Sequence, residues 1–252
     1  MKWYLKNLRA WAIASVSMVS LAMSLTSCLD DDDDDAYYLS IPNALVTVKP
    51  TADNAFYLQL DDSTTLFATN MSNSPFGEKE VRALTNFEVV NEPANGYDKA
   101  VHINWIDSIL TKSIAPDMGL KNDSIYGTNE VEIINDWVTI AEDGYLTLRF
   151  RTMNAYPGAK HFVNLLMSKD PEHPYEVEFR HNAFGDNYGP MADGLVAFKL
   201  DSLPDTNGET VKLKLKWRSF SGDKSAEFDY CTRKSTPAKA AIAKEKSSLN
   251  LN

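Results

Sequence analysis

The stretch VKLKLKWR, residues 211–218, alternates apolar and basic side chains without interruption. Successive side chains of a β-strand point to opposite faces of the sheet, so the alternation separates the two kinds of residue. One face would carry Val211, Leu213, Leu215 and Trp217, and the other Lys212, Lys214, Lys216 and Arg218. This pattern predicts a strand of an antiparallel sheet, with one face in a hydrophobic core and the other in water.

The basic face of this strand has two interpretations. Lysines on an exposed strand oppose edge-to-edge aggregation, which requires no ligand. Alternatively, the row of positive charges could dock an acidic partner or the phosphates of a lipid.

The rest of the second half repeats short alternating runs separated by turn residues such as Asp143-Gly144, Asp193-Gly194 and Asn207-Gly208. No stretch of ten or more residues keeps apolar side chains at helical spacing. We therefore predict a β-sandwich over residues 113–232. Its other expected strands are Tyr145–Phe150, Phe162–Met167, Tyr175–Arg180, Leu195–Leu200 and Ser225–Cys231.

The first half contains five further apolar runs at shorter intervals, which fits a small closed barrel of the OB type over residues 36–112. Residues 111–122 contain Pro116 and Gly119 and form the expected link, which could hold isolated helical turns. The fold class is thus all-β, a barrel followed by a sandwich. The expected barrel strands are Leu45–Val48, Phe56–Leu60, Thr65–Thr69, Val81–Val90 and Val101–Leu110.

The first 27 residues are typical of a cleavable signal peptide. Lys2, Lys6 and Arg9 precede a short uncharged apolar run, which is too short to span a bilayer comfortably. The run ends in LTSC, residues 25–28, an aliphatic residue and two small residues before a cysteine. We expect Cys28 to become the lipid-bearing first residue and to anchor the protein in a membrane. The alternative is an ordinary secretory leader that ends near a cysteine.

Residues 28–35 form an acidic tether, because Asp30 to Asp35 repel one another and cannot pack. Such a run behind a lipidated cysteine resembles a surface-export signal of one lineage of Gram-negative lipoproteins. The expected location is therefore the outer membrane, facing either outward or toward the periplasm. The lysine-, alanine- and serine-rich residues 233–252 are expected to be a disordered tail.

Composition and motifs exclude several classes of function. The net charge is −10, which argues against nucleic-acid binding, since that binding rests on lysine and arginine. No motif for a nucleophile, a phosphate loop or a metal site is present, so we expect no enzyme activity, cofactor or metal. Cys231 is expected to be a small buried hydrophobe. The four histidines, of which His161 and His181 lie at strand ends and could meet, are His102, His161, His173 and His181.

One segment is the candidate interaction site. Residues 178–186, EFRHNAFGD, run from a strand into a turn that gathers Arg180, His181, Asn182 and Asp186 around Phe184, which is expected to be buried. The alternative is a turn that satisfies its own backbone, with Asn182 and Asp186 as caps.

The chain also contains short Asp-Ser motifs that are similar to an O-glycosylation sequon of exported proteins in the same bacterial lineage. A motif this short also arises by chance in a chain rich in aspartate and serine. The motifs begin at Asp62, Asp107, Asp123 and Asp201.

Several segments, in this order, resemble the NigD-like lipoproteins. They are INDWV (134–138), GYLTL (144–148), KHFVNL (160–165), EFRHNAFGD (178–186), the basic strand and EFDY (227–230). The resemblance implies an N-terminal OB-type barrel and a C-terminal β-sandwich on a lipid anchor. It also implies a possible role as a bacteriocin immunity protein, but no catalytic residues.

Three functions stay open at this stage. The first is a non-enzymatic envelope protein that binds another protein, the second is a glycan-binding accessory lipoprotein, and the third is an enzyme. A protein binder needs a contiguous apolar patch, a glycan binder needs ring faces exposed in a row, and an enzyme needs convergent groups with perturbed pKa values.

Overall fold

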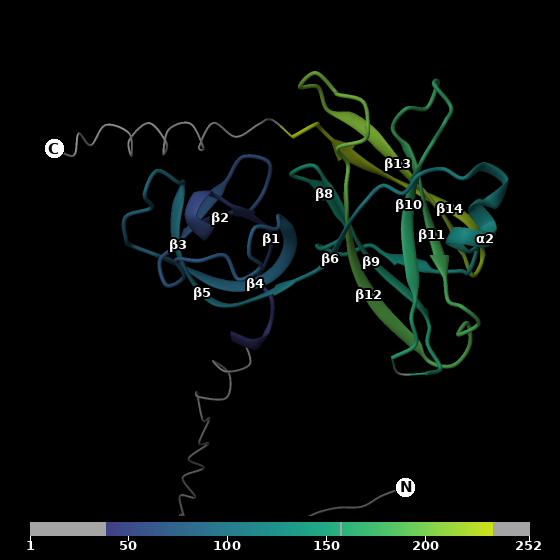
Figure 1. Cartoon of the computed structure of the whole chain (residues 1–252), viewed down its shortest axis with the longest axis horizontal. Coiled ribbons are helices and arrows are strands. Elements are labelled where there is room, and N and C mark those ends of the chain that lie inside the picture. The colour runs from purple at the N-terminus through teal and green to yellow at the C-terminus, as the bar shows by residue number, and fades with distance from the viewer. Residues whose placement is uncertain (1–38, 157, 234–252) are drawn as a thin grey trace, which may run out of the picture.

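A computed structural model describes residues 39–156 and 158–233 (Figure 1). The predicted signal peptide, Cys28, the acidic tether and residues 234–252 of the predicted tail lie outside the described residues. The described chain forms a closed β-barrel followed by a β-sandwich, as the sequence predicts.

The barrel closes in the strand order β1-β2-β3-β5-β4. Strand β1 pairs with both β2 and β4, and the parallel pair β3–β5 completes the ring. Its interior is filled by Val46, Val48, Leu58, Leu66 and Val101, none of which is exposed. The elements are β1 Ala44–Pro50, the 3-10 turn η1 Ala52–Asn54, β2 Phe56–Gln59, β3 Thr65–Ala68, β4 Val81–Val90 and β5 Lys99–Ser108.

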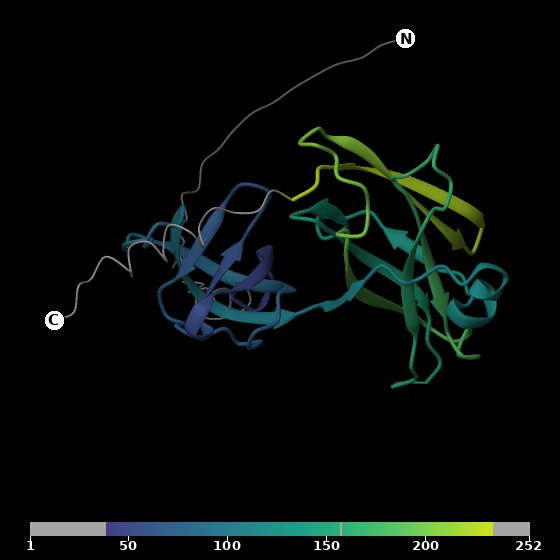
Figure 2. The same cartoon turned by 45° about the horizontal axis from the view of Figure 1, so that its top comes forward.

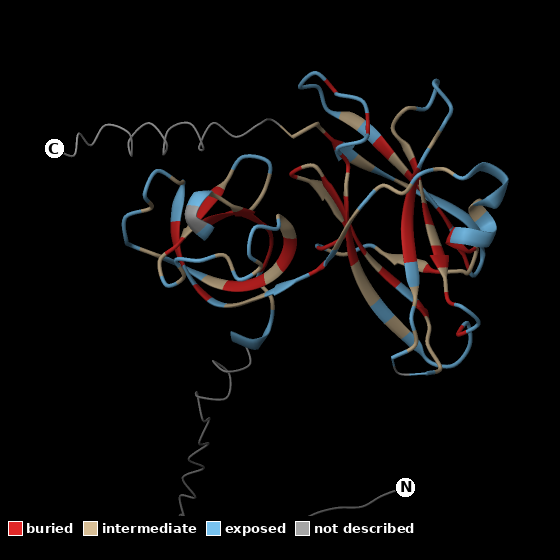
Figure 3. Cartoon of the chain, in the orientation of Figure 1, coloured by how far each residue is buried: buried red, intermediate tan, exposed pale blue. Residues whose placement is uncertain are grey.

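The sandwich packs two sheets against each other, and Figure 3 shows the buried residues gathered between them. One sheet has the order β10-β11-β13-β14, and the other β6-β12-β9-β7 with β8 also paired to β9. The strands are β6 Leu110–Ser113, β7 Glu132–Ile134, β8 Ile140–Glu142, β9 Tyr145–Met153, β10 Phe162–Met167, β11 Glu176–Asn182, β12 Met191–Lys199, β13 Val211–Ser219 and β14 Gly222–Tyr230.

Strand β13 has the two faces predicted from residues 211–218. Leu213, Leu215 and Trp217 are buried in the sandwich core. The basic face is already neutralised by acidic side chains of neighbouring strands and of the loop before β7, which favours the interpretation as a solvated face. The ion pairs are Lys212–Asp229, Lys214–Glu176, Lys216–Glu176 and Arg218–Glu130.

The predicted turn at Asp193-Gly194 is wrong, because both residues lie inside β12, which starts at Met191. Gly194 is required there by packing: a Cβ atom on it would lie 2.4 Å from the ring of Phe150 on β9. Asp193 pairs with Arg149 and Arg151 across the sheet, which holds the pKa of its carboxyl at about 2. Contacts with side chains of β9 thus place in a strand an Asp-Gly pair that is typical of turns.

The predicted domain boundary at residue 112 falls inside β6, which pairs in parallel with β12 of the sandwich. The chain therefore enters the sandwich at Leu110, and Figures 1 and 2 both show it crossing from the barrel along this segment. The expected helical turns in the link are present as the 3-10 turn η2, Gly119–Lys121, and the helix α2, Asn122–Tyr126.

Barrel and sandwich are joined by buried ionic contacts. Arg82 of β4 is fully buried and donates to Glu142 of β8 at 2.5 Å. Lys49 of β1 lies 2.7 Å from Asp143, in the β8–β9 turn. Arg233 pairs with Glu80 of the barrel at 2.8 Å. The prediction of a disordered tail over residues 233–252 is therefore wrong for Arg233.

Candidate functional site

Two loops meet at one end of the sandwich and form the candidate site. The first connects β9 to β10 (residues 154–161), and the second connects β11 to β12 (residues 183–190). The predicted interaction segment, residues 180–186, leads from β11 into the second loop. The structure brings His181 and Asp186 together here, but it places Arg180 and Asn182 in other roles.

Arg180 faces away from this end and pairs with Asp123 of α2 at 2.7 Å and with Glu178 at 2.9 Å. Asn182 accepts a hydrogen bond from the backbone N–H of Phe184 at 2.9 Å, which is an Asx turn of the kind that the alternative interpretation predicts. Both residues therefore shape the scaffold beside the site.

Asp186 fastens the two loops to each other. Its carboxylate is 5% exposed and accepts from the backbone N–H of Ala155 at 2.9 Å and of Tyr156 at 3.5 Å. It also lies 3.3 Å from Nε2 of His161, which in turn contacts His181. These hydrogen bonds hold the pKa of Asp186 below its usual value. We call Asp186, His161 and His181 the loop latch.

The two histidines do approach each other, with Nδ1 of His161 2.9 Å from Nε2 of His181. When Nε2 of His161 carries the hydrogen and donates to the Asp186 carboxylate, Nδ1 of the neutral ring accepts a hydrogen bond from Nε2 of His181. His181 is 1% exposed, and burial together with the neighbouring His161 lowers its pKa to about 4. His181 is therefore neutral near pH 7.

The loop latch should make stability depend on pH. The unfolded chain binds a proton on His181 below its ordinary pKa of 6.5, whereas the folded chain resists it until about pH 4. Stability is thus complete above pH 6.5 and is lost as the pH falls. We expect the folded state to lose about 2 kcal/mol from this residue between pH 7.5 and pH 5. Urea unfolding at both pH values measures the difference.

The matched variants separate His181 from the other titrating groups. His181→Gln should show a smaller loss of stability on acidification, whereas His173→Gln, at an exposed position, should keep the wild-type loss. An equal loss in all three proteins would contradict the assignment to the loop latch.

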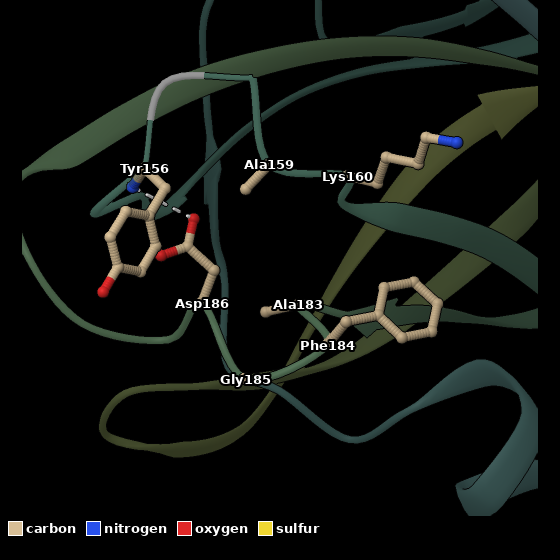
Figure 4. A pocket seen from close by; sticks show the side chains of 7 residues that line it. All are labelled: Tyr156, Ala159, Lys160, Ala183, Phe184, Gly185 and Asp186. Atoms are coloured by element: carbon tan, nitrogen blue, oxygen red, sulfur yellow. Dashed lines mark hydrogen bonds between the residues drawn. The ribbon is translucent and has the colours of Figure 1, made fainter.

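Outside the latch, the two loops and β10 expose aromatic side chains. Tyr156 is 62%, Phe184 67%, Tyr188 48% and Phe162 42% exposed. The hydroxyls of Tyr156 and Tyr188 lie 2.6 Å apart, and the rings of Phe162 and Phe184 lie 6.5 Å apart. We call these four residues the tip surface. Between Tyr156 and Phe184 lies a cavity of about 570 Å³, whose lining residues Figure 4 shows.

Phe184 was expected to be buried, and this prediction is wrong. Its ring is largely in solvent, and its backbone has φ of +49°, in the left-handed region. This conformation is unfavourable for a bulky residue and costs about 1–2 kcal/mol, whereas glycine or asparagine adopts it easily. A strained, exposed phenylalanine contributes little to the core, and such strain gathers at functional sites.

The other residues singled out in the sequence are placed as follows. Cys231, which was expected to be buried, is only half-buried, beside the Thr206 hydroxyl. Trp137, the tryptophan of the INDWV segment, is 52% exposed in the loop before β8. Within residues 39–156 and 158–233, no group of three or more histidine, cysteine or acidic side chains has an arrangement that could hold a metal ion. The serines of the four Asp-Ser motifs, whose glycosylation stays a prediction, are all exposed; they are Ser63, Ser108, Ser124 and Ser202.

The comparisons with known families match both domains. A model of the NigD-like N-terminal OB domain matches residues 45–109, and one of the NigD-like C-terminal β-sandwich domain matches residues 113–230. The chain belongs to the NigD-like family. No curated protein matches it.

Several solved structures are similar to this NigD-like protein. A Parabacteroides distasonis protein described as a "Putative TOXIN related protein" is 38% identical, with TM-score 0.64, over 80% of this chain and 97% of that one. A Bacteroides caccae "NigD-like immunity protein" is 20% identical, with TM-score 0.55, over 75% and 96%. A Bacteroides fragilis "Putative lipoprotein" is 12% identical, with TM-score 0.50, over 76% and 98%. The last two show a shared fold alone.

Among the described residues, no helix combines the length and the hydrophobicity that crossing a bilayer requires.

Proposed function

We propose that this NigD-like chain is a non-enzymatic lipoprotein of the cell envelope that binds another protein through its tip surface, in an immunity-type role. The observation that carries the proposal is Phe184, which is 67% exposed at φ +49° beside a cavity. An exposed aromatic side chain on a rigid support is typical of the residues that dominate protein interfaces. A Bacteroides caccae protein of the same fold is described as a "NigD-like immunity protein", which agrees with this role.

The arrangement of the rings favours a protein over a glycan as the partner. A sugar stacks on ring faces that lie in a row. Tyr156 and Tyr188 instead stand edge to face at 89°, and Phe162 and Phe184 are tilted by 43°. The four rings present an uneven apolar surface with a cavity, which suits side chains of a partner. Glycan binding is the alternative function.

The anchor is proposed from the sequence. The LTSC segment ends in Cys28, and we propose that lipid on this cysteine holds the protein in the outer membrane. A protein of the same fold is described as a "Putative lipoprotein", which agrees with a lipid anchor. The net charge of −10 supports a partner other than nucleic acid.

The substitution Phe184→Asn tests the proposed function. Asparagine tolerates the left-handed conformation, so we expect unchanged stability or a gain of up to about 1 kcal/mol. Binding should nevertheless be lost. The measurement is a pull-down from native membranes with the chain from Leu29 to Asn252, which contains every described residue, followed by thermal unfolding of each variant.

The matched control is Trp137→Asn, which removes an exposed aromatic side chain from the loop between β7 and β8, outside the tip surface. A protein captured by wild type and by the control, but not by Phe184→Asn, supports the proposal. Capture that survives Phe184→Asn contradicts the assigned surface. A glycan-array signal without any captured protein would move the assignment to carbohydrate recognition.

A further inference from the structure

The cavity of the tip surface is lined mainly by apolar groups. The rings of Tyr156 and Phe184 stand on opposite sides, and Ala159 and Ala183 lie between them (Figure 4). A volume of about 570 Å³ falls in the range of pockets that enclose a ligand group. The hydrogen bonds of the loop latch hold the two loops together. The cavity is therefore formed before a partner binds, which lowers the entropic cost of binding.

Two charged residues line the cavity, and only one of them is available to a partner. The Asp186 carboxylate is 5% exposed and is already occupied by the backbone N–H of Ala155 and by His161. Lys160 is exposed and forms no ion pair within the described residues. Figure 4 shows its side chain on the same side of the cavity as Phe184, away from Asp186.

Lys160 differs from the lysines of β13 in having no acidic partner, and from Lys121 and Lys199, which also form no ion pair within the described residues, in lining the cavity. Lys212, Lys214 and Lys216 of β13 each pair with an acidic side chain. In a chain whose net charge is −10, a free ammonium group next to an apolar cavity is the local complement of a negative group.

We propose that the cavity accepts an apolar side chain of the partner protein that is flanked by an aspartate or glutamate, whose carboxylate pairs with Lys160. The inference rests on the proposed function and adds the chemistry of the partner's epitope. The apolar side chain fills the space between Tyr156 and Phe184. The carboxylate then lies at the cavity rim, where Lys160 can reach it without displacing Asp186 from the loop latch.

The test uses an array of immobilised twelve-residue peptides, each with an aromatic or leucine residue beside Asp or Glu, and a matched set with Asn or Gln. The probe is the chain from Leu29 to Asn252. We expect the acidic peptides to bind about tenfold more tightly than their amide counterparts, the effect of one charge-assisted hydrogen bond. Raising the salt concentration should reduce this difference.

Three variants assign the effect to residues. Lys160→Gln should lower binding of the acidic peptides to that of the amide peptides, and Phe184→Asn should abolish both. Lys121→Gln removes the same charge from an exposed position on η2 and should change neither.

The outcomes separate this inference from the proposed function. Peptides that need Phe184 but bind equally in acidic and amide forms, or that ignore Lys160→Gln, overturn the carboxylate pairing and leave a protein-binding tip surface. An array without any Phe184-dependent peptide also overturns the inference, and the membrane pull-down then decides the proposed function by itself.

Discussion

Replacing Arg82 by methionine is expected to lower the free energy of unfolding by about 3–5 kcal/mol. Arg82 is fully buried between barrel and sandwich, where it donates to Glu142 at 2.5 Å and to the hydroxyl of Thr47 at 3.0 Å. Methionine fills much of the space but leaves the Glu142 carboxylate without its counter-ion. Chemical denaturation at pH 7.5 measures the loss.

The pH dependence identifies the cause. Burial already raises the pKa of Glu142 in the wild-type protein, and Arg82 opposes that rise. Without Arg82 the pKa should rise further, so the carboxyl takes up a proton more readily in the folded than in the unfolded chain. The deficit of Arg82→Met should therefore shrink as the pH falls from 7.5 to 5.

Two controls accompany Arg82→Met. Arg218→Met removes an exposed ion pair of the β13 face and should cost less than about 1 kcal/mol. The double variant Arg82→Met, Glu142→Gln should recover part of the lost stability, since it removes the uncompensated charge. Equal losses for Arg82→Met and Arg218→Met would show that the buried pair does not join the domains.

Replacing Gly127 by alanine is expected to cost about 2–5 kcal/mol. Gly127 ends α2 with φ of +78°, and an added Cβ would lie 2.4 Å from the backbone oxygen of His181. The backbone conformation, positive φ with extended ψ, accounts for about 1–2 kcal/mol and the overlap for about 1–3 kcal/mol. Because the neighbour is backbone of β11, it cannot rotate away as a side chain would. Thermal and urea unfolding give the value.

Gly96→Ala is the matched control for Gly127→Ala. Gly96 has φ of +88° in a barrel loop, and a Cβ on it would meet nothing within 4 Å. It should show the conformational cost alone, so the difference between the two variants measures the contact with β11. Similar losses in both would mean that α2 moves aside without cost.

The strands with two chemically different faces could be predicted from the sequence, because alternation is a local property. Residues 211–218 needed no knowledge of their neighbours, since the apolar face and the basic face differ at every step. The turn predicted at Asp193-Gly194 was wrong because the reason for the glycine is not local. The Phe150 ring that leaves no room for a Cβ atom belongs to another strand. The short strands β6, β7 and β8 were missed because three or four residues carry too little pattern.

The site was only partly predictable. The segment around His181 and Asp186 was identified, and its strand-end position predicted that His161 could approach. Phe184 was misassigned to the interior because hydrophobicity alone does not show that a turn points a ring outward. Lys160 gave no signal at all, since its lack of an ion pair is a property of the assembled surface.

The buried ionic joint between the domains has a mechanical consequence. Arg82 and Lys49 in the barrel contact the hairpin of β8 and β9, and Arg233, which follows β14, pairs with Glu80 of the barrel and lies 3.6 Å from Asp143 of that hairpin. The joint therefore lacks the freedom of a hinge. We expect the barrel and the sandwich to move as one rigid body when force acts on the N-terminal end of the barrel. A change in the orientation of the tip surface then requires both domains to rotate together.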